Sequence, residues 1–284
     1  MRNNGFTLME LITVIIILGI VGIGITSFMR FGFSVYQDAS IREALVSQSR
    51  FVVERLNREL RMVIPNSVRV NRVANDEACI EFVPIAESGS YLTLPTESLA
   101  DEGELIAQNS NYQFQAGDWL VVYPLQSSDV YAGTGAKRHT LESYTLSNNK
   151  VDVAFNSAGV LFAAHSPQRR FYIGRGAVSY CFDALNRQLL RFDNYGVLVN
   201  QPTISTFTSA GIAGVLMAEG VSNNLVDNEV PFIFQTATLT TNALIELYLR
   251  FSGVKNELAG SIAEQAVTAE SLFFYNQVHL PNVP

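Results

Sequence analysis

The chain has 284 residues, of which 48% are hydrophobic and 16% are charged, and its formal net charge at pH 7 is −7. This balance excludes a disordered chain, and the length is sufficient for one or two domains. The charge is uneven, because residues 1–65 hold seven arginines and five acidic residues (+2), whereas residues 66–284 hold twelve basic and twenty-one acidic residues (−9). We call residues 66–284 the body of the protein. Its acidic charge disfavours binding to nucleic acid or to an anionic membrane surface.

An uncharged stretch lies close to the N-terminus. Residues 11–29 are 19 consecutive positions without a charged side chain, and at about 1.5 Å per residue a helix of this length crosses the hydrocarbon core of a bilayer. Gly19, Gly22 and Gly24 lie within it, and membrane helices and tightly packed helices tolerate glycine better than soluble helices do. The stretch is therefore either a membrane helix or the core of a helical bundle.

Glu10 places a carboxylate at the edge of this stretch. Its insertion into a membrane would cost about 2.5–3.5 kcal/mol unless a positive charge neutralises it. One interpretation puts Glu10 at the level of the lipid headgroups, where it needs no partner. The other gives it a partner, the α-amine of Phe6, which a cut after Gly5 would create by releasing the basic leader 1–5.

In this region the sequence resembles the type IV pilins and the related pseudopilins of type II secretion. The shared signature is a short basic leader, a glycine, a phenylalanine, a glutamate four residues later and a long apolar helix. The resemblance implies that a membrane prepilin peptidase cleaves between Gly5 and Phe6, and that Phe6 is N-methylated. It also implies that Glu10 pairs with the Phe6 amine of its own or a neighbouring subunit. A secretory signal peptide is the alternative, but residues 27–31 fit its small-residue cleavage site poorly.

Beyond the apolar stretch the helical pattern continues and becomes amphipathic. Apolar residues recur on one helical face at Ile41, Leu45, Val52, Leu56, Leu60 and Val63. Two pairs have the i,i+4 spacing of ion pairs within a helix, Glu54 with Arg58 and Arg55 with Glu59. Because Pro65 disfavours helix at the residue before it, we expect the helix to end near Ile64.

After residue 65 the hydrophobic period changes to two, which is typical of β-strands. We expect strands at residues 80–83, 119–123, 178–182, 189–192, 232–234, 245–251 and 272–278. The segment 178–182 should form a hairpin with 189–192, and 232–234 should pair with 245–251. Within the segment 245–251, the inward-facing residues should be Ile245, Leu247, Leu249 and Phe251.

These patterns predict an α+β, pilin-like fold in which a long N-terminal helix packs on an antiparallel β-sheet domain. The expected parts are a leader at 1–5, a helix at 6–65 and a β-rich periplasmic domain at 66–284. Within the helix, residues 6–33 would lie in the membrane or the fibre core and residues 34–65 would be amphipathic.

Two long connections of low hydrophobicity, residues 97–111 and 127–143, are predicted to be surface loops, and loops of this length are often functional. The two cysteines, Cys79 and Cys181, both lie beyond the anchor, on the side reached by translocation. In the oxidising periplasm they would form a disulfide, worth up to about 4–5 kcal/mol in the chain-entropy model. Two buried free thiols are the alternative.

The residue patterns do not predict catalysis, a cofactor or a metal site. His139, His165 and His279 are far apart in the sequence and belong to no metal-binding motif. An acidic cluster in the first long connection offers the hard oxygens that calcium prefers, although a solvated loop is the simpler interpretation. Its members are Glu97, Asp101, Glu102 and Glu104. We therefore expect a protein that is not an enzyme and has no cofactor.

Motifs along the body narrow the resemblance to the large minor pilins. They lie at residues 117–123, 178–181, 189–192, 218–221 and 279–284, and they are most similar to the MshO type of the mannose-sensitive haemagglutinin (MSHA) pilus, followed by the PilW type. The resemblance implies a single-pass inner-membrane protein with a periplasmic body that moves to the pilus tip and primes assembly. Its partners would be major and minor pilins, prepilin peptidase, the inner-membrane assembly platform and membrane lipid, without nucleic acid.

Two other functions remain open from the sequence. One is a minor pseudopilin of a type II secretion system, which shares the N-terminal signature. The other is a tip adhesin whose long loops bind a glycan or a surface, although no recognisable binding site is present. An anchored periplasmic enzyme is the least favoured, because the chain has no catalytic constellation.

Overall fold

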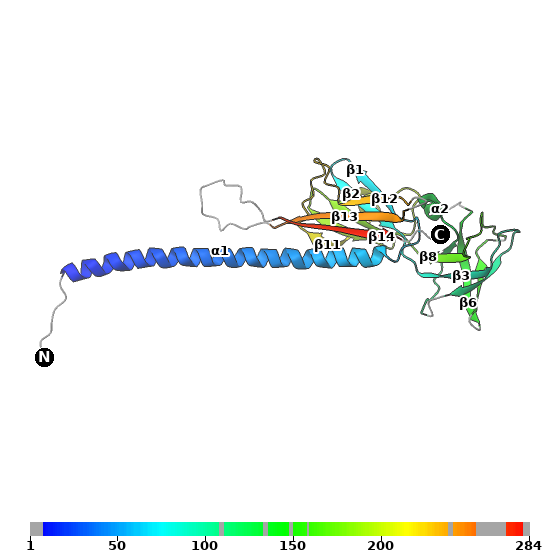
Figure 1. The fold of residues 1–284 in the computed structure, drawn as a ribbon, viewed down its shortest axis with the longest axis horizontal. Coiled ribbons are helices and arrows are strands. Elements are labelled where there is room, and N and C mark those ends of the chain that lie inside the picture. The colour runs from blue at the N-terminus through cyan, green and yellow to red at the C-terminus, as the bar shows by residue number, and fades with distance from the viewer. Residues whose placement is uncertain are drawn as a thin grey trace. The chain divides into compact units, whose positions relative to one another are not determined.

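The computed structural model describes residues 8–107, 111–132, 136–147, 150–157, 159–237, 241–253 and 271–280. It contains two compact units, one comprising Met1–Ser47 with Gly253–Glu270 and the other Gln48–Ser252 with Ser271–Pro284. The first unit contains most of a long helix. The second contains the last turns of that helix and the strands of the described chain (Figure 1).

The long helix, α1, runs from Leu8 to Leu60 and has 53 residues. It ends four residues before the predicted Ile64, because the chain here leaves the helix to pair with an extended segment. Ile64 donates a backbone hydrogen bond to the carbonyl of Val83 at 2.9 Å, and Val63 forms a β-bridge with Pro84.

Two antiparallel sheets make up much of the second unit. The five-stranded sheet has the order β1-β2-β9-β10-β11. Its strands are β1 (Arg69–Val73), β2 (Glu77–Phe82), β9 (Val178–Asp183), β10 (Gln188–Phe192) and β11 (Val215–Glu219). The three-stranded sheet has the order β12-β13-β14. Its strands are β12 (Phe232–Gln235), β13 (Ala243–Ser252) and β14 (Ser271–Leu280).

The strand predictions for these two sheets are confirmed. β9 and β10 form the expected hairpin, with Cys181 opposite Leu190. β12 pairs with β13, with Phe232 opposite Leu247. Along β13, buried residues alternate with half-buried ones, so the predicted inward face is correct. The last strand is longer than predicted and reaches Leu280.

The final turns of α1 pack on the sheets through the predicted apolar face. Val52, Leu56 and Leu60 are fully buried. Polar contacts border this face on both sides: Arg191 Nε of β10 donates to Glu59 Oε2 at 3.2 Å, and Asn276 Nδ2 of β14 donates to Asn57 Oδ1 at 2.6 Å. The chain therefore has the predicted α+β, pilin-like fold, with a long N-terminal helix followed by antiparallel sheets.

A closed barrel, which the sequence did not predict, lies between β2 and β9 in the chain. Its strand order is β3-β4-β7-β6-β5-β8. The strands are β3 (Glu87–Thr93), β4 (Glu102–Ala107), β5 (Trp119–Val121), β6 (Arg138–Ser147), β7 (Lys150–Phe155) and β8 (Arg170–Gly174). Its interior is filled by side chains such as Leu105, Leu120, Val151 and Phe171, all 0% exposed.

The barrel corrects the prediction of two long loops. Residues 97–111 contain β4, and residues 127–143 contain a short helix, α2 (Ser127–Tyr131), and the start of β6. Both segments have few apolar residues, because a barrel strand needs apolar side chains on its inner face only. Leu105 and Leu141 supply these inward contacts from β4 and β6.

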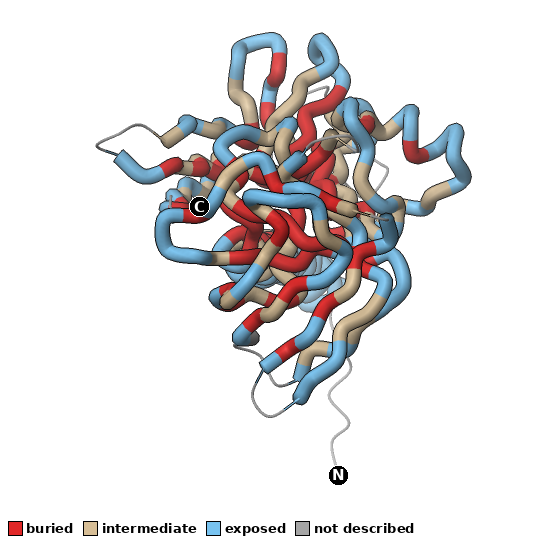
Figure 2. Tube along the Cα trace, turned by 90° about the vertical axis from the view of Figure 1, so that its right-hand side faces the viewer, coloured by how far each residue is buried: buried red, intermediate tan, exposed pale blue. Residues whose placement is uncertain are grey.

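The five-stranded sheet is covered on both faces, and every residue of β2 is buried. On one face the rings of Phe82 and Tyr180 stack, with their centroids 6.2 Å apart. On the other, Cys79 and Cys181 pack with Phe207 of a second short helix, α3 (Ile204–Ser209). In Figure 2 the buried segments gather in the interior of the traced chain, and exposed segments form most of its outer turns.

Candidate assembly and membrane-anchoring site

The first part of α1 exposes apolar side chains on every side. Residues 8–36 are all exposed, and the four successive side chains of Ile15, Ile16, Ile17 and Leu18 are 60%, 56%, 59% and 62% exposed. These four side chains point to different sides of the helix, because successive residues of a helix are about 100° apart. By length and composition this helix is suited to cross a membrane. Such a surface is stable only against lipid or against other apolar helices.

Three hydroxyl groups in this segment, those of Thr13, Thr26 and Ser34, bond within the helix. Thr13 Oγ1 donates to the carbonyls of Met9 and Glu10 at 3.1 and 3.0 Å. Thr26 Oγ1 donates to Gly22 at 2.8 Å, and Ser34 Oγ donates to Phe31 at 2.8 Å. These hydroxyls therefore enter an apolar environment without losing their hydrogen bonds.

The glycines of α1 are not required by packing within the described chain. A Cβ atom added at Gly19, Gly22 or Gly24 would meet nothing within 4 Å. Each glycine therefore leaves a flat place on the helix surface, where the backbone of another helix can approach closely. This arrangement suits lateral packing between helices.

Glu10 is exposed and lies in the first turn of α1. A carboxylate at this end of a helix interacts favourably with the positive end of the helix dipole. The predicted processing residues, Gly5 and Phe6, lie outside the described residues. The structure thus places the Glu10 side chain but not the Phe6 amine with which it was predicted to pair.

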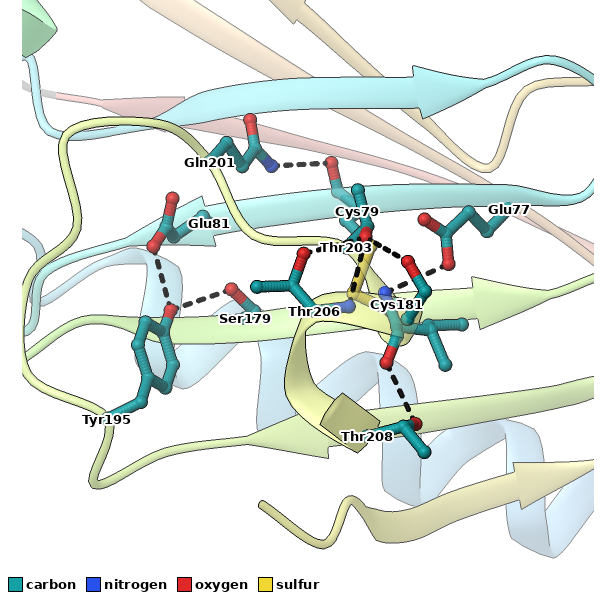
Figure 3. The surroundings of a disulfide bond; sticks show 12 residues. Glu77, Cys79, Glu81, Ser179, Cys181, Tyr195, Gln201, Thr203, Thr206 and Thr208 are labelled. Carbon is teal, nitrogen blue, oxygen red and sulfur yellow. Dashed lines mark hydrogen bonds between the residues drawn. A yellow bond between two sulfur atoms is a disulfide. The ribbon is translucent and has the colours of Figure 1, made fainter. Parts of the chain in front are cut away.

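A second feature of interest is the point at which the barrel segment is inserted. Residues 83–177 leave the sheet after β2 and return at β9, and these two strands are neighbours, with Phe82 opposite Val178. Cys79 and Cys181 lie opposite each other in the same ladder and form a disulfide, with their Cα atoms 4.1 Å apart (Figure 3). The disulfide therefore joins the two strands four residues before the insertion begins at residue 83.

A buried carboxylate lies close to this disulfide. Glu81 is 0% exposed and accepts hydrogen bonds from Arg69 Nε at 2.5 Å and from the Tyr195 hydroxyl at 2.8 Å. The Tyr195 hydroxyl also pairs with that of Ser179 at 2.7 Å (Figure 3). Burial raises the pKa of Glu81, and the hydrogen bonds from Arg69 and Tyr195 limit this rise. The network ties β1, β2, β9 and the segment after β10 together.

Sequence reasoning missed this network. The one signal was a charged residue, Glu81, between apolar residues of a short predicted strand, which indicates a carboxylate with a buried partner. Its partners were not predictable, because Arg69 lies on a strand that no sequence pattern predicted and Tyr195 is 114 residues away in the sequence.

The structure does not assemble the predicted acidic residues into a metal site. Within the described ranges, no group of three or more histidine, cysteine, aspartate or glutamate side chains is arranged to hold a metal ion. Of the three histidines, His165 and His279 are exposed, and His139 packs edge-on against Phe162 with the ring centroids 4.6 Å apart.

Comparison with known proteins gives one match, to the prokaryotic N-terminal methylation motif, over residues 1–26. No curated protein and no solved structure matches the chain. The motif is that of type IV pilin-like proteins, which are structural proteins processed by prepilin peptidase and anchored by a single N-terminal helix. The matched motif and the exposed apolar helix therefore support a pilin or pseudopilin class for this chain.

Proposed function

We propose that this protein is a minor pilin of an MSHA-type type IV pilus, located at or near the tip, where it primes assembly. The observation that carries the proposal is an apolar helix exposed on every side over residues 8–36, together with the methylation motif at residues 1–26. A helix of this kind can lie first in the inner membrane and then among the apolar helices of a fibre.

The proposed processing follows the motif. Prepilin peptidase cuts between Gly5 and Phe6, the leader 1–5 is lost, and the new amine of Phe6 is methylated. Residues 6–33 then serve as membrane anchor and fibre core, and residues 66–284 form the periplasmic body. Glu10 sets the position of the helix along its neighbours by pairing with a Phe6 amine. The Cys79–Cys181 disulfide forms in the oxidising periplasm.

The position near the tip is supported by the size of the body. Besides two sheets, the body contains a six-stranded barrel. A subunit repeated along every turn of a thin fibre would have to accommodate this barrel at each repeat, whereas a subunit at the tip has no such restriction. Its partners would be the major and minor pilins below it and the inner-membrane assembly platform.

A minor pseudopilin of type II secretion fits the same motif and helix, because the N-terminal signature is common to both classes. Deletion of the protein separates the two functions. Loss of surface pili with normal secretion supports the pilin, and loss of secreted enzymes with normal pili supports the pseudopilin.

The role of Glu10 is tested by Glu10→Ala, with Glu43→Ala as a matched control on an exposed position of the same helix. Hydrogen bonds to charged groups contribute about 1.5–3 kcal/mol, so we expect Glu10→Ala to lower the amount in sheared fibres by about tenfold or more. The variant should still be processed, and its body should keep the disulfide. Normal incorporation of Glu10→Ala would overturn the proposed role.

A further inference from the structure

We propose that the open edge of β14 binds an extended, acidic segment of a neighbouring subunit by adding it to the sheet as a further strand. This inference rests on the proposed function, because it names a contact that the protein makes in the assembled fibre. β14 is the edge strand of the three-stranded sheet, and among the strands that the structure describes it pairs with β13 alone (Figure 1).

The hydrogen bonds of β13 show which backbone groups of β14 point off the open edge. The amide of Tyr248 donates to Pro231 at 2.9 Å, on the side away from β14. Because backbone groups alternate sides along a strand, the odd-numbered residues of β13 bond toward β14. Their partners in β14 are even-numbered, such as Asn276 opposite Leu247. The residues whose N–H and C=O groups point outward are therefore Ser271, Phe273, Tyr275, Gln277 and His279.

These outward groups are available for pairing. Within the described part of the chain, none of the five residues makes a backbone hydrogen bond outside the β13–β14 ladder. All five are exposed. They offer N–H and C=O groups at every second position along the edge, which matches the spacing of an incoming strand.

β14 also lacks the features by which edge strands normally avoid pairing. Its ten residues contain no lysine, arginine, aspartate, glutamate or proline, and its register with β13 is continuous from Ser271 to Leu280 without a bulge. Proteins usually protect an edge strand by charge, proline, a bulge or short length. A long unprotected edge is therefore expected to be covered by a partner.

The exposed face of the β13–β14 pair, next to this edge, carries residue types that are common at protein interfaces. Phe273 and Tyr275 are 46% and 53% exposed. The ring of Tyr248 packs edge-on against Phe273, with centroids 4.0 Å apart, and the Arg250 guanidinium lies 5.9 Å from the centroid of Phe273. Phenylalanine, tyrosine and arginine are the residue types enriched at protein interfaces.

The charge of the partner is inferred from the helix that borders this edge. Asn57 of α1 contacts Asn276 of β14. Arg50 and Arg61 lie seven residues before and four residues after Asn57, so they share its side of the helix, and the amide of Arg61 still donates to the Asn57 carbonyl at 3.2 Å. Both arginines are exposed, and within the described ranges neither has an ion-pair partner. Glu54, three residues before Asn57, is an exposed carboxylate on the same side of α1. A strand added beside β14 would therefore meet two positive charges and one negative charge, and this positive balance favours a segment that carries carboxylates.

The edge is tested by Gln277→Lys in the full chain, expressed in cells that have the assembly machinery. Lysine on an edge strand prevents strand addition. The matched control is Gln235→Lys, an exposed glutamine on β12, a different strand of the same sheet. The charge preference is tested by the double variant Arg50→Glu/Arg61→Glu, with Arg58→Glu as the control on another exposed face of α1.

The measurement is the amount of each mature variant in sheared fibres relative to membranes. We expect Gln277→Lys and the double variant to fall by about tenfold or more, and both controls to stay within about twofold of the unmodified protein. Unchanged thermal unfolding of the four variants excludes misfolding as the cause. Retention of either test variant at the level of its control would overturn the inference. Leader removal, measured in the same samples, reports separately on the proposed function.

Discussion

Asp118 shows how a single buried carboxylate is held in the barrel. Its side chain is 0% exposed and accepts hydrogen bonds from Arg175 Nε at 2.7 Å, the Tyr112 hydroxyl at 2.7 Å and the Gln115 amide at 3.0 Å. Burial alone would raise the pKa of Asp118, but these hydrogen bonds outweigh burial, so its pKa lies below the ordinary value.

This pKa predicts an acid-sensitive contribution to stability. A carboxylate whose pKa is lowered by folding stabilises the protein above its unfolded pKa, and this contribution is lost as the pH falls through the folded pKa. We therefore expect the free energy of unfolding to fall between about pH 5 and about pH 2, and Asp118→Asn to reduce that dependence. Asp152→Asn, at an exposed position of β7, is the control. An unchanged pH dependence in Asp118→Asn, measured by denaturant unfolding across this range, would contradict the assignment.

At the scale of elements, α1 combines two helices of different character in one. Residues 8–36 are exposed throughout, whereas the final turns bury one face against the sheets. The first part is suited to lipid and other helices, and the second fixes the body to the end of the helix.

This division predicts that truncating a buried apolar side chain in the last turns of α1 lowers the free energy of unfolding strongly, whereas truncating an exposed one changes it little. Leu56 is 0% exposed, so Leu56→Ala should lower the free energy of unfolding of the body by about 2–5 kcal/mol. Phe51 is 54% exposed, so Phe51→Ala should change it by about 0.5 kcal/mol or less. Denaturant unfolding of the full chain in detergent measures both. Equal losses in the two variants would contradict the packing described for this helix.

Elements differ in how well the sequence predicts them. α1 was predictable from a long uncharged run followed by one apolar face at helical spacing, and β13 from its alternation of apolar and polar residues. The barrel was not, since β4 offers one fully buried large side chain, Leu105, whereas its other large apolar residue, Ile106, is 43% exposed. The closure of six strands is a property of long-range pairing that local patterns do not contain. Glu10 stood out because its charge interrupts an apolar run, whereas the Glu81 network depends on residues that meet only in the fold.

At the scale of the whole molecule, the body consists of two antiparallel sheets and a barrel. The barrel segment is inserted between β2 and β9, two neighbouring strands of the five-stranded sheet. The β2–β9 ladder, the Cys79–Cys181 disulfide and the Glu81 network all lie where the barrel segment leaves and re-enters the sheet. Because these interactions join the two strands that carry the insertion, they allow a large addition without disrupting the sheet. The barrel thus gives the body extra surface, while the chain keeps a pilin-like N-terminal helix.

The central claim, that this helix is processed and assembled as a pilin, is tested most directly by intact mass and N-terminal sequencing of the protein from membranes and from sheared fibres. The account predicts a chain that begins at methylated Phe6 and occurs in fibres in trace amounts. A chain that keeps Met1, or that begins beyond Met29, would contradict the pilin assignment and indicate an anchored or secreted protein instead.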